Sequence, residues 1–434
     1  MSTARPHPNA WSTGDAERWL LSLELFGMRF GLDRMRLLMT TLDAPNEAFA
    51  AIHVVGTNGK SSTVRMIDAL LRHHGCHSGA YLSPHLVSFS ERILVGGANI
   101  SDDRLAASLQ RARRAAELVD RTLDADDHVT QFEALTAAAY AQLAEAQVDV
   151  AVVEAGLGGR WDATNVLEAD VAVLTNVGLE HTRWLGPTVK DIAHEKLAIV
   201  APGATLVLGA DLHPDAEAEA QLVAERQGAT IVHAAAQPGW IEQDFELLAR
   251  GEFQRRNFSL ACAAAEAFLG ECKGDAVRAA AASTLVPGRF EIVQAGDGVG
   301  EVVLDGAHNP SGMAALAETL SDYLAGRPLV AVMSVLDDKD AARMLGELLA
   351  LCAGAVFTTN SNPRALSPAT LASLAGQVGV GDVESFSRLE ADPRRALRVA
   401  RELAGERGVV LATGSIYLIA DLTRPAGAGP GSML

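Results

Sequence analysis

The sequence is short of cysteine, of positive charge and of long apolar runs. Its four cysteines, Cys76, Cys262, Cys272 and Cys352, form no CxxC pair, which excludes a disulfide framework and predicts reduced, mostly buried thiols. No stretch of about 18 uninterrupted apolar residues occurs, so there is no transmembrane candidate. The first residues carry Pro, Asn and acidic side chains where a secretory leader would be apolar, and we therefore expect a cytoplasmic protein.

The charge balance is acidic. Against 54 Asp and Glu stand only 36 Lys and Arg, giving a formal net charge of −18 in 434 residues. A surface of this sign repels phosphate backbones and anionic lipids. We therefore expect neither nucleic acid nor a membrane as partner.

Short β-branched runs alternate with helical stretches rich in Ala and Leu, which predicts an α/β fold with mainly parallel sheets covered by helices. The expected strands are 52–55, 148–153, 171–174, 205–208, 301–304, 329–333 and 409–412, and the clearest helices are 61–74, 105–122 and 275–282. A change of composition at 285–289 predicts a larger domain over 1–286 and a smaller one over 287–434. The Pro- and Gly-rich tail from about Arg424 is expected to be disordered.

The sharpest local signal is I-H-V-V-G-T-N-G-K-S-S at 52–62, an apolar strand that runs through a glycine-rich turn into a helix. Backbone N–H groups of such a turn bind phosphate oxygens, Lys60 would reach the terminal phosphates, and Ser61 or Ser62 would reach a Mg²⁺ ion. The spacing G-x-x-G-K-S is shorter than that of the general phosphate-binding loop, so an ordinary turn is the alternative.

Two further strands end in residues that carry chemistry. The run V-D-V-A-V-V ends at Glu154, and V-A-V-L-T-N-V-G-L-E-H ends at His181, before a helical segment that contains Lys196. Either side chain alone could serve a structural role, Glu154 as a helix cap or a satisfied loop acid. Because parallel strands place their carboxyl ends along one edge of a sheet, Lys60, Glu154 and His181 are expected to converge.

The second domain repeats this pattern of a strand followed by a polar loop. The strand E-V-V-L leads into D-G-A-H-N-P, which places Asp305, His308 and Asn309 on one loop. Asp-Gly and Asn-Pro are also ordinary turn formers, so this loop identifies no reaction by itself. The segments 334–340 and 412–419 follow strands in the same way.

Taken in order, these motifs resemble one family, the dihydrofolate synthase/folylpolyglutamate synthase enzymes within the ATP-dependent Mur ligase superfamily. The resemblance extends over nearly the whole chain. It is carried by L-F-G-M-R-F-G-L-D-R-M (25–35), G-T-N-G-K, Y-L-S-P-H-L (81–86), S-E-R-I, G-L-G-G-R-W-D-A-T-N, P-G-R-F, D-G-A-H-N-P, D-K-D and T-G-S-I-Y-L-I.

The resemblance implies a fold, an activity and a set of site residues. The fold would be a larger P-loop ATPase-like domain that carries the folate site, followed by a smaller Rossmann-like glutamate-ligase domain. The activity would be ATP-dependent addition of L-glutamate to dihydropteroate, to reduced folates, or to both, through an acyl phosphate. Two Mg²⁺ ions and a carbamylated Lys196 are implied, a monovalent cation is left open, and a monomer is expected.

The implied residues fall into five groups. ATP would be bound by Gly56, Thr57, Asn58, Gly59, Lys60, Ser61, Ser62, Asn257, Arg289 and Asp305. Pteroate or folate would be bound by Arg29, Phe30, Thr130, Phe132, Trp161, Asp162 and Ala163. Glutamate would be handled by His308 and Ser415, Mg²⁺ by Ser83, Glu154 and His181, and the catalytic groups would be Lys60, Lys196, Asp305 and His308.

Several departures from the family pattern keep other hypotheses open. Arg183 inverts a charge near the expected metal, and Leu197 and Ala198 crowd the turn after Lys196. They favour, as an alternative, a paralogous Mur-type ligase that joins an amino acid to a different carboxylate. A nucleotide-binding regulatory or scaffold protein is the hypothesis from another class, and it would show no turnover that a Lys60→Ala substitution could remove.

Overall fold

The computed structural model describes residues 11–23, 31–234, 246–293, 300–379 and 386–425. By compactness the chain forms two units, one of residues 1–246 and 257–283 with residue 434, the other of residues 247–256 and 284–433. The division after residue 283 lies close to the change of composition at 285–289. Nothing in the local composition predicts that residues 247–256 belong to the second unit.

The first unit is built on an eight-stranded sheet with the order β4-β3-β2-β5-β1-β6-β7-β8. Strands β3 and β4 run antiparallel to their neighbours and the other pairs are parallel. The strands are β1 (Ala50–Val55), β2 (Ser78–Tyr81), β3 (Ile93–Val95), β4 (Ala98–Asn99), β5 (Val150–Glu154), β6 (Val171–Leu174), β7 (Thr205–Leu208) and β8 (Thr230–His233).

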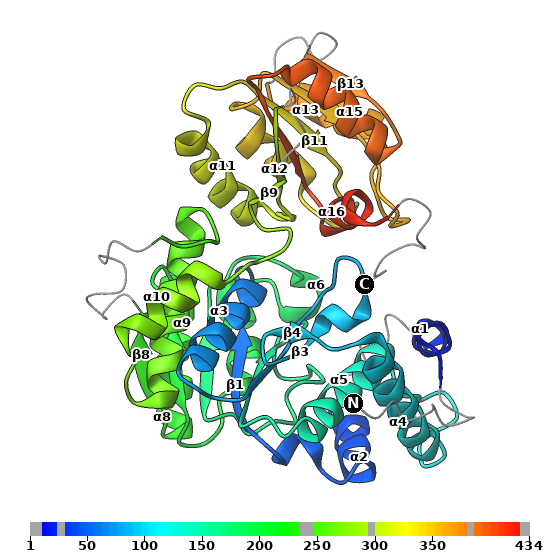
Figure 1. Ribbon diagram of the computed structural model, residues 1–434, viewed down its shortest axis with the longest axis vertical. Helices are drawn as coiled ribbons and strands as arrows, with labels where there is room; N and C mark the ends of the chain where they lie inside the picture. Colours follow the sequence, from blue (N-terminus) through cyan, green and yellow to red (C-terminus); the bar gives the residue numbers. More distant parts are fainter. Residues whose placement is uncertain (1–10, 24–30, 235–245, 294–299, 380–385, 426–434) are drawn as a thin grey trace, which may run out of the picture. The chain divides into compact units, whose positions relative to one another are not determined.

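Helices and short 3₁₀ turns connect these strands. They are α1 (Thr13–Ser22), α2 (Asp33–Thr41), η1 (Pro45–Glu47), α3 (Lys60–His73), η2 (Phe89–Arg92), α4 (Asp102–Asp120), α5 (Gln131–Glu145), α6 (Thr182–Leu185), α7 (Val189–Lys196), η3 (Leu197–Ile199), α8 (Pro214–Gln227), α9 (Glu252–Leu269), which begins in the second unit, and α10 (Gly274–Ser283). Helices α4 and α5 lie side by side (Figure 1) and share one apolar core with α1, α2 and the sheet.

The second unit has a six-stranded sheet with the order β13-β12-β11-β14-β10-β9, in which only the β9–β10 pair is antiparallel among the described residues. Its elements are β9 (Glu291–Val293), β10 (Glu301–Leu304), α11 (Pro310–Leu324), β11 (Leu329–Met333), α12 (Ala341–Leu349), β12 (Gly354–Phe357), α13 (Pro368–Gln377), β13 (Ser387–Leu389), α15 (Pro393–Ala404), β14 (Val409–Thr413) and α16 (Ile416–Thr423). A separate apolar core fills this unit.

The predicted α/β class with mainly parallel sheets is confirmed. β1, β5, β6, β10, β11 and β14 are fully or almost fully buried, as expected for strands covered on both faces. All four cysteines are free thiols, two of them buried. None of the helices in the described ranges is long and apolar enough to cross a membrane. The tail beyond Pro425, which we expected to be disordered, lies outside the described residues.

Candidate active site

The glycine-rich turn joins β1 to the first residue of α3, Lys60. Gly59 caps the helix in the left-handed region with a φ of 82°, where a side chain would be strained. A Cβ on Gly56 would lie 1.8 Å from Thr175 Oγ1 and one on Gly59 would lie 2.5 Å from Asn257 Oδ1. The turn therefore needs both glycines, and the N-terminus of α3 that follows it is suited to binding an anion.

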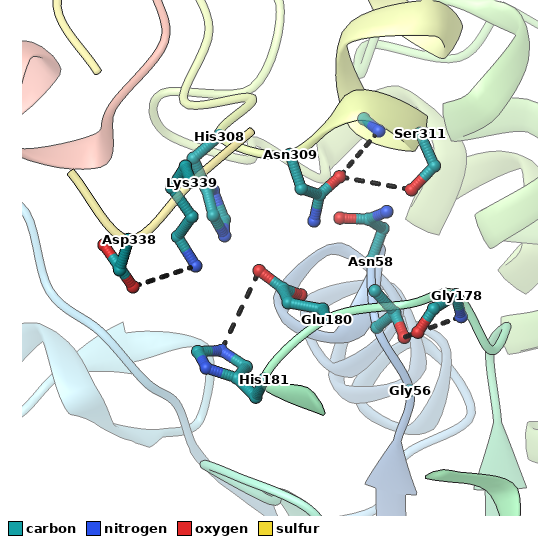
Figure 2. Close-up of polar contacts among 12 residues, drawn as sticks. Gly56, Asn58, Gly178, Glu180, His181, His308, Asn309, Ser311, Asp338 and Lys339 are labelled. Atoms are coloured by element: carbon teal, nitrogen blue, oxygen red, sulfur yellow. Dashed lines mark hydrogen bonds and ion pairs between the residues drawn. The ribbon is translucent and has the colours of Figure 1, made fainter. Parts of the chain in front are cut away.

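The segment after β6 holds this turn in place. Thr175 Oγ1 donates to Asn58 O at 2.6 Å, and Asn58 N donates to Asn176 Oδ1 at 3.0 Å. Gly178 N donates to Thr57 Oγ1 at 3.0 Å (Figure 2). In the sequence this segment attracts attention only for His181, and these contacts could not be predicted because they join residues more than 110 positions apart.

Two lysines approach the turn. The Lys60 ammonium donates to Gly56 O at 3.1 Å and to Thr57 O at 3.2 Å, so it folds back over the turn. Lys196 is 5% exposed and donates to Gly56 O at 2.7 Å. Burial, together with the charge of Lys60, lowers the pKa of Lys196 from 10.5 to about 7. At neutral pH, Lys196 is thus a partly neutral amine next to the glycine-rich turn, residues 56–60, which is called the phosphate turn below.

Glu154 is the buried carboxylate at the end of β5, 1% exposed. It accepts hydrogen bonds from Ser61 Oγ at 2.9 Å and from Ser83 N at 3.1 Å. Hydroxyl and carboxylate oxygens are the ligands that Mg²⁺ prefers, so the chemistry of these residues fits the expected ion. In the part of the chain that is described, no three His, Cys, Asp or Glu residues gather in a way that could hold a metal by themselves.

His181 begins the short helix α6 from the left-handed region, with a φ of 52°. Its Nε2 lies 3.8 Å from Glu180 Oε1 (Figure 2). Nearby, the Arg183 guanidinium stacks on Trp184 with its Cζ 5.1 Å from the ring centroid. The charge that departs from the family pattern is therefore accommodated against an aromatic ring of its own helix. Leu197, another departure, is completely buried.

Most of the expected pteroate residues that are described lie in one region of the first unit. Phe132 stacks on Tyr81 with ring centroids 6.3 Å apart. A Cβ on Gly156 would meet Phe132 Cζ at 2.7 Å and Asp162 Oδ2 at 3.2 Å, so Phe132 and Asp162 flank the same glycine. Arg29 and Phe30 lie outside the described residues.

Asp162 is almost completely buried. Its Oδ1 accepts from Thr164 N at 3.0 Å and from Thr164 Oγ1, and its Oδ2 accepts from Leu157 N at 2.7 Å. Burial raises its pKa above the ordinary value, although these hydrogen bonds oppose the rise. The neighbouring Trp161 is 46% exposed and lines an open hollow of about 550 Å³ with Trp184, whereas Ala163 is buried.

In the second unit, Asp305 follows β10 and is 3% exposed. It accepts from Phe290 N and from Ala307 N, each at 2.8 Å. Burial raises the pKa of Asp305, while the charge of Arg289 opposes the rise. The loop after β10 is therefore tied to the P-G-R-F segment, as the shared role of Arg289 and Asp305 would require.

His308 and Ser415 also follow strands of this sheet. His308 Nδ1 lies 2.8 Å from Gly306 O, and since a carbonyl only accepts, Nδ1 carries a proton in this contact. Ser415 caps α16 by accepting from Tyr417 N at 3.2 Å.

Two further polar residues follow strands of the second unit. Asn309 caps α11 and accepts from Gly312 N and Ser311 Oγ (Figure 2). Lys339 lies 3.7 Å from Asp338.

Known proteins resemble this chain over most of its length. Residues 54–265 match the Mur ligase middle domain and residues 288–416 match the Mur ligase, glutamate ligase domain. A dihydrofolate synthase/folylpolyglutamate synthase of Mycobacterium tuberculosis is 38% identical over 380 residues, which are 80% of this chain and 77% of the relative. One of Bacillus subtilis is 33% identical over 434 aligned positions, covering 94% of this chain and 98% of the relative.

A solved structure agrees with the sequence relatives. Mycobacterium tuberculosis folylpolyglutamate synthase complexed with ADP is 34% identical, with a TM-score of 0.87 over 96% of this chain and 99% of that one. These similarities extend through both compact units. The chain therefore belongs to the dihydrofolate synthase/folylpolyglutamate synthase family of Mur ligases.

Proposed function

We propose that this protein is an ATP-dependent ligase that adds L-glutamate to dihydropteroate, to reduced folates, or to both, releasing ADP and phosphate. The observation that carries the proposal is the phosphate turn at Gly56–Lys60 with Glu154 hydrogen-bonded to Ser61 beside it, in a chain of this family. That arrangement supplies phosphate-binding donors and oxygen ligands for a metal at the same sheet edge.

The chemistry explains why these residue types are needed. A carboxylate is a poor electrophile, so its oxygen first takes the γ-phosphoryl group of ATP and ADP leaves. The amine of glutamate then attacks the acyl phosphate, the amide forms, the amine loses a proton and phosphate departs. Negative charges meet in the first step, and Lys60 offsets part of them from its place over the turn.

Ser83, Glu154 and His181 would hold Mg²⁺, which supplies neutralisation of charge on the phosphate oxygens. The buried carboxylate of Glu154 is the centre of this set, since it contacts both Ser61 of α3 and Ser83 after β2. A second Mg²⁺ and a monovalent cation remain predictions. In the second unit, His308 and Ser415 would handle the incoming glutamate.

The pteroate part of the substrate would lie against Phe132, Asp162 and Trp161. Phe132 offers a ring face and Asp162 a buried acceptor near the same glycine, which together suit a flat heterocycle that carries N–H donors. Thr130 and Ala163 belong to the same set. Arg29 and Phe30 remain predictions for this region.

We also propose that Lys196 is carbamylated. A carbamate forms from a neutral amine and CO₂, and burial lowers the pKa of Lys196 to about 7. The product is an anion. The positive charge of Lys60, which disfavours the Lys196 cation, would attract this anion. With ¹³C-bicarbonate, the wild type should show a carbamate carbon signal that is missing from Lys196→Met, and its absence from the wild type would refute the modification.

The activity is tested by ADP release with L-glutamate and either dihydropteroate or tetrahydrofolate. We expect turnover with at least one acid, and a loss of at least about a hundredfold in Lys60→Ala. Lys190→Ala is the matched control, because that lysine is exposed on α7. Wild-type turnover with neither acid would refute the folate assignment and favour a ligase for another carboxylate.

The monomeric state and the cytoplasmic location remain predictions. Sedimentation velocity at working concentration tests the first, and fractionation of the source cells tests the second.

A further inference from the structure

The loop before α5 and the first turn of α5 are held by contacts with three other helices. Gln131 Nε2 donates to Leu20 O of α1 at 3.0 Å, and Val129 N donates to Asp120 Oδ1 of α4 at 2.9 Å. The third anchor is Arg34 of α2, 7% exposed, whose Nε lies 3.0 Å and 3.1 Å from the two carboxylate oxygens of Glu133. The family resemblance assigns individual roles to Thr130, which caps α5, and to Phe132 in its first turn, whereas Arg34 enters it only as part of the 25–35 motif.

Glu133 transmits the position of Arg34 to Thr130. Its Oε2 accepts from Thr130 N and from Thr130 Oγ1, each at 2.9 Å, and its own N–H donates back to Thr130 Oγ1 at 3.3 Å. This is a capping box, but an unusual one, because its carboxylate is buried and paired with a buried guanidinium. Arg34 Nη1 also binds Asp127 Oδ1 at 3.0 Å, which fixes the start of the loop.

The hydrogen-bond directions limit what Thr130 can offer to a ligand. A hydroxyl has one proton, and Thr130 gives it to the Glu133 carboxylate, which can only accept while it is ionised. The remaining lone pair of Oγ1 can therefore only accept. Arg34 holds in place the carboxylate that receives this proton, so it fixes Thr130 as an acceptor for an N–H or O–H donor.

We propose that Arg34 is a positioning residue for the pterin end of the substrate, acting through Glu133 on Thr130 and Phe132. The inference rests on the proposed function, since it takes the pteroate or folate acid as the occupant of this region. Arg34 itself need not touch the substrate. We expect Arg34 to change the affinity for the pterin acid and not for ATP or glutamate. The phosphate turn and the glutamate-handling residues belong to other segments of the chain.

Three variants separate this role from simple support of the fold. Arg34→Met removes the cation and leaves Glu133 buried. Glu133→Gln keeps an acceptor for Thr130 and removes only the charge. The double variant Arg34→Met/Glu133→Gln removes both charges, so it tests the proposal even if the first variant fails to fold. Arg36→Met is the matched control, since Arg36 is on the same helix and pairs at 3.1 Å with Asp33 while 66% exposed.

Steady-state kinetics with each substrate varied in turn gives the deciding readout. In Arg34→Met we expect the KM for the pterin acid to rise at least about tenfold, while kcat at saturation and the KM values for ATP and glutamate change less than about twofold. Titration of the pterin acid without ATP, followed by tryptophan fluorescence, should show the same loss of affinity. The double variant should be no worse than Arg34→Met.

Other outcomes overturn the proposal. Equal shifts of all three KM values, or a fall in kcat alone, would show that Arg34 merely supports the fold. An unchanged KM for the pterin acid in the folded double variant would do the same. Failure of the wild type to turn over either pterin acid is a different result, which refutes the proposed function itself and this inference with it.

Discussion

Two residues of the same type can differ in their titration behaviour in this protein because one is buried and the other is exposed. Lys196 and Lys190 belong to the same helix, yet one is 5% exposed and lies against the phosphate turn whereas the other faces solvent. Burial makes Lys196 an amine that titrates near neutral pH, and this is the property that a lysine destined for carbamylation needs. The same consideration applies to His53 of β1, whose complete burial lowers its pKa to about 3 and keeps the ring neutral.

The burial of Lys196 has a consequence for stability that depends on pH. The unfolded chain holds this proton up to about pH 10, while the folded chain releases it near 7. Between these values the unfolded state binds more protons, so the unfolding free energy of the wild type should rise with pH, by up to about 1.4 kcal/mol per pH unit. Below pH 7 the cost of the buried charge is present in full.

Lys196→Met should therefore be stabilised relative to wild type most at pH 6, and the gain should shrink as pH rises towards 10. Urea unfolding at pH 6, 8 and 9.5 in CO₂-free buffer measures this, with Lys190→Met as the control that should show no trend. Parallel curves for wild type and Lys196→Met would contradict the assignment.

At the scale of elements, the phosphate turn depends on close contact between two strand ends. We expect Gly56→Ala to lower ADP release by at least about a hundredfold, because its Cβ would collide with Thr175 Oγ1 at 1.8 Å and force the turn away from β6. The stability cost should be about 1–3 kcal/mol.

Gly346→Ala is the control for this element. Gly346 lies in α12, and nothing lies within 4 Å of the position of its Cβ. The substitution should raise stability by about 0.5–1 kcal/mol without changing ADP release. Wild-type activity in Gly56→Ala would show that the turn tolerates a side chain and is not held as described.

The comparison of elements also shows what the sequence could predict. Strands β6, β7, β10 and β11 have the predicted bounds, because short β-branched runs bounded by turn residues leave few alternatives. The order of the strands and the contacts of Thr175 and Asn176 with the phosphate turn could not be read from local pattern. The strand order depends on pairing between distant segments, and the contacts of Thr175 and Asn176 join residues more than 110 positions apart.

The site residues also divide into those that the sequence predicts and those that only the fold brings together. Lys60, Glu154 and Lys196 could be named from strand-end chemistry and resemblance, and their roles remain predictions. The Arg34–Glu133 pair could not be predicted, because Arg34 stands in the 25–35 motif that carried the resemblance but nothing in the sequence links it to Glu133. Only the fold brings it to Glu133, 99 positions away.

At the scale of the molecule, two units with separate apolar cores should not unfold in one step. Leu345→Ala empties space in the core of the second unit and should cost about 2–5 kcal/mol. In differential scanning calorimetry it should lower one transition, while ADP should raise mainly the other, because the glycine-rich turn that would hold the phosphates belongs to the first unit.

Leu403→Ala, on the same unit but 46% exposed, should change stability by less than about 0.5 kcal/mol. A single transition that both Leu345→Ala and ADP shift by equal amounts would show that the two units unfold together.

Metal removal should separate activity from folding. The cores are apolar and the expected ligands are a carboxylate, a serine and a histidine at the sheet edge, so EDTA should abolish ADP release without shifting the unfolding midpoint by more than about 2 °C. Added Mg²⁺ should restore activity. A large loss of stability in EDTA would mean that the ion is structural.

The path of the chain between the units constrains how the protein can be divided. The polypeptide enters the second unit at residue 247, returns to the first at Asn257 within helix α9, and leaves again after residue 283. Neither unit is therefore a continuous segment, and no single cut or single recombination point yields one of them intact. An exchange of the second unit between relatives needs three crossovers, at 246/247, 256/257 and 283/284. A graft that starts at residue 284 would lose the first turn of α9.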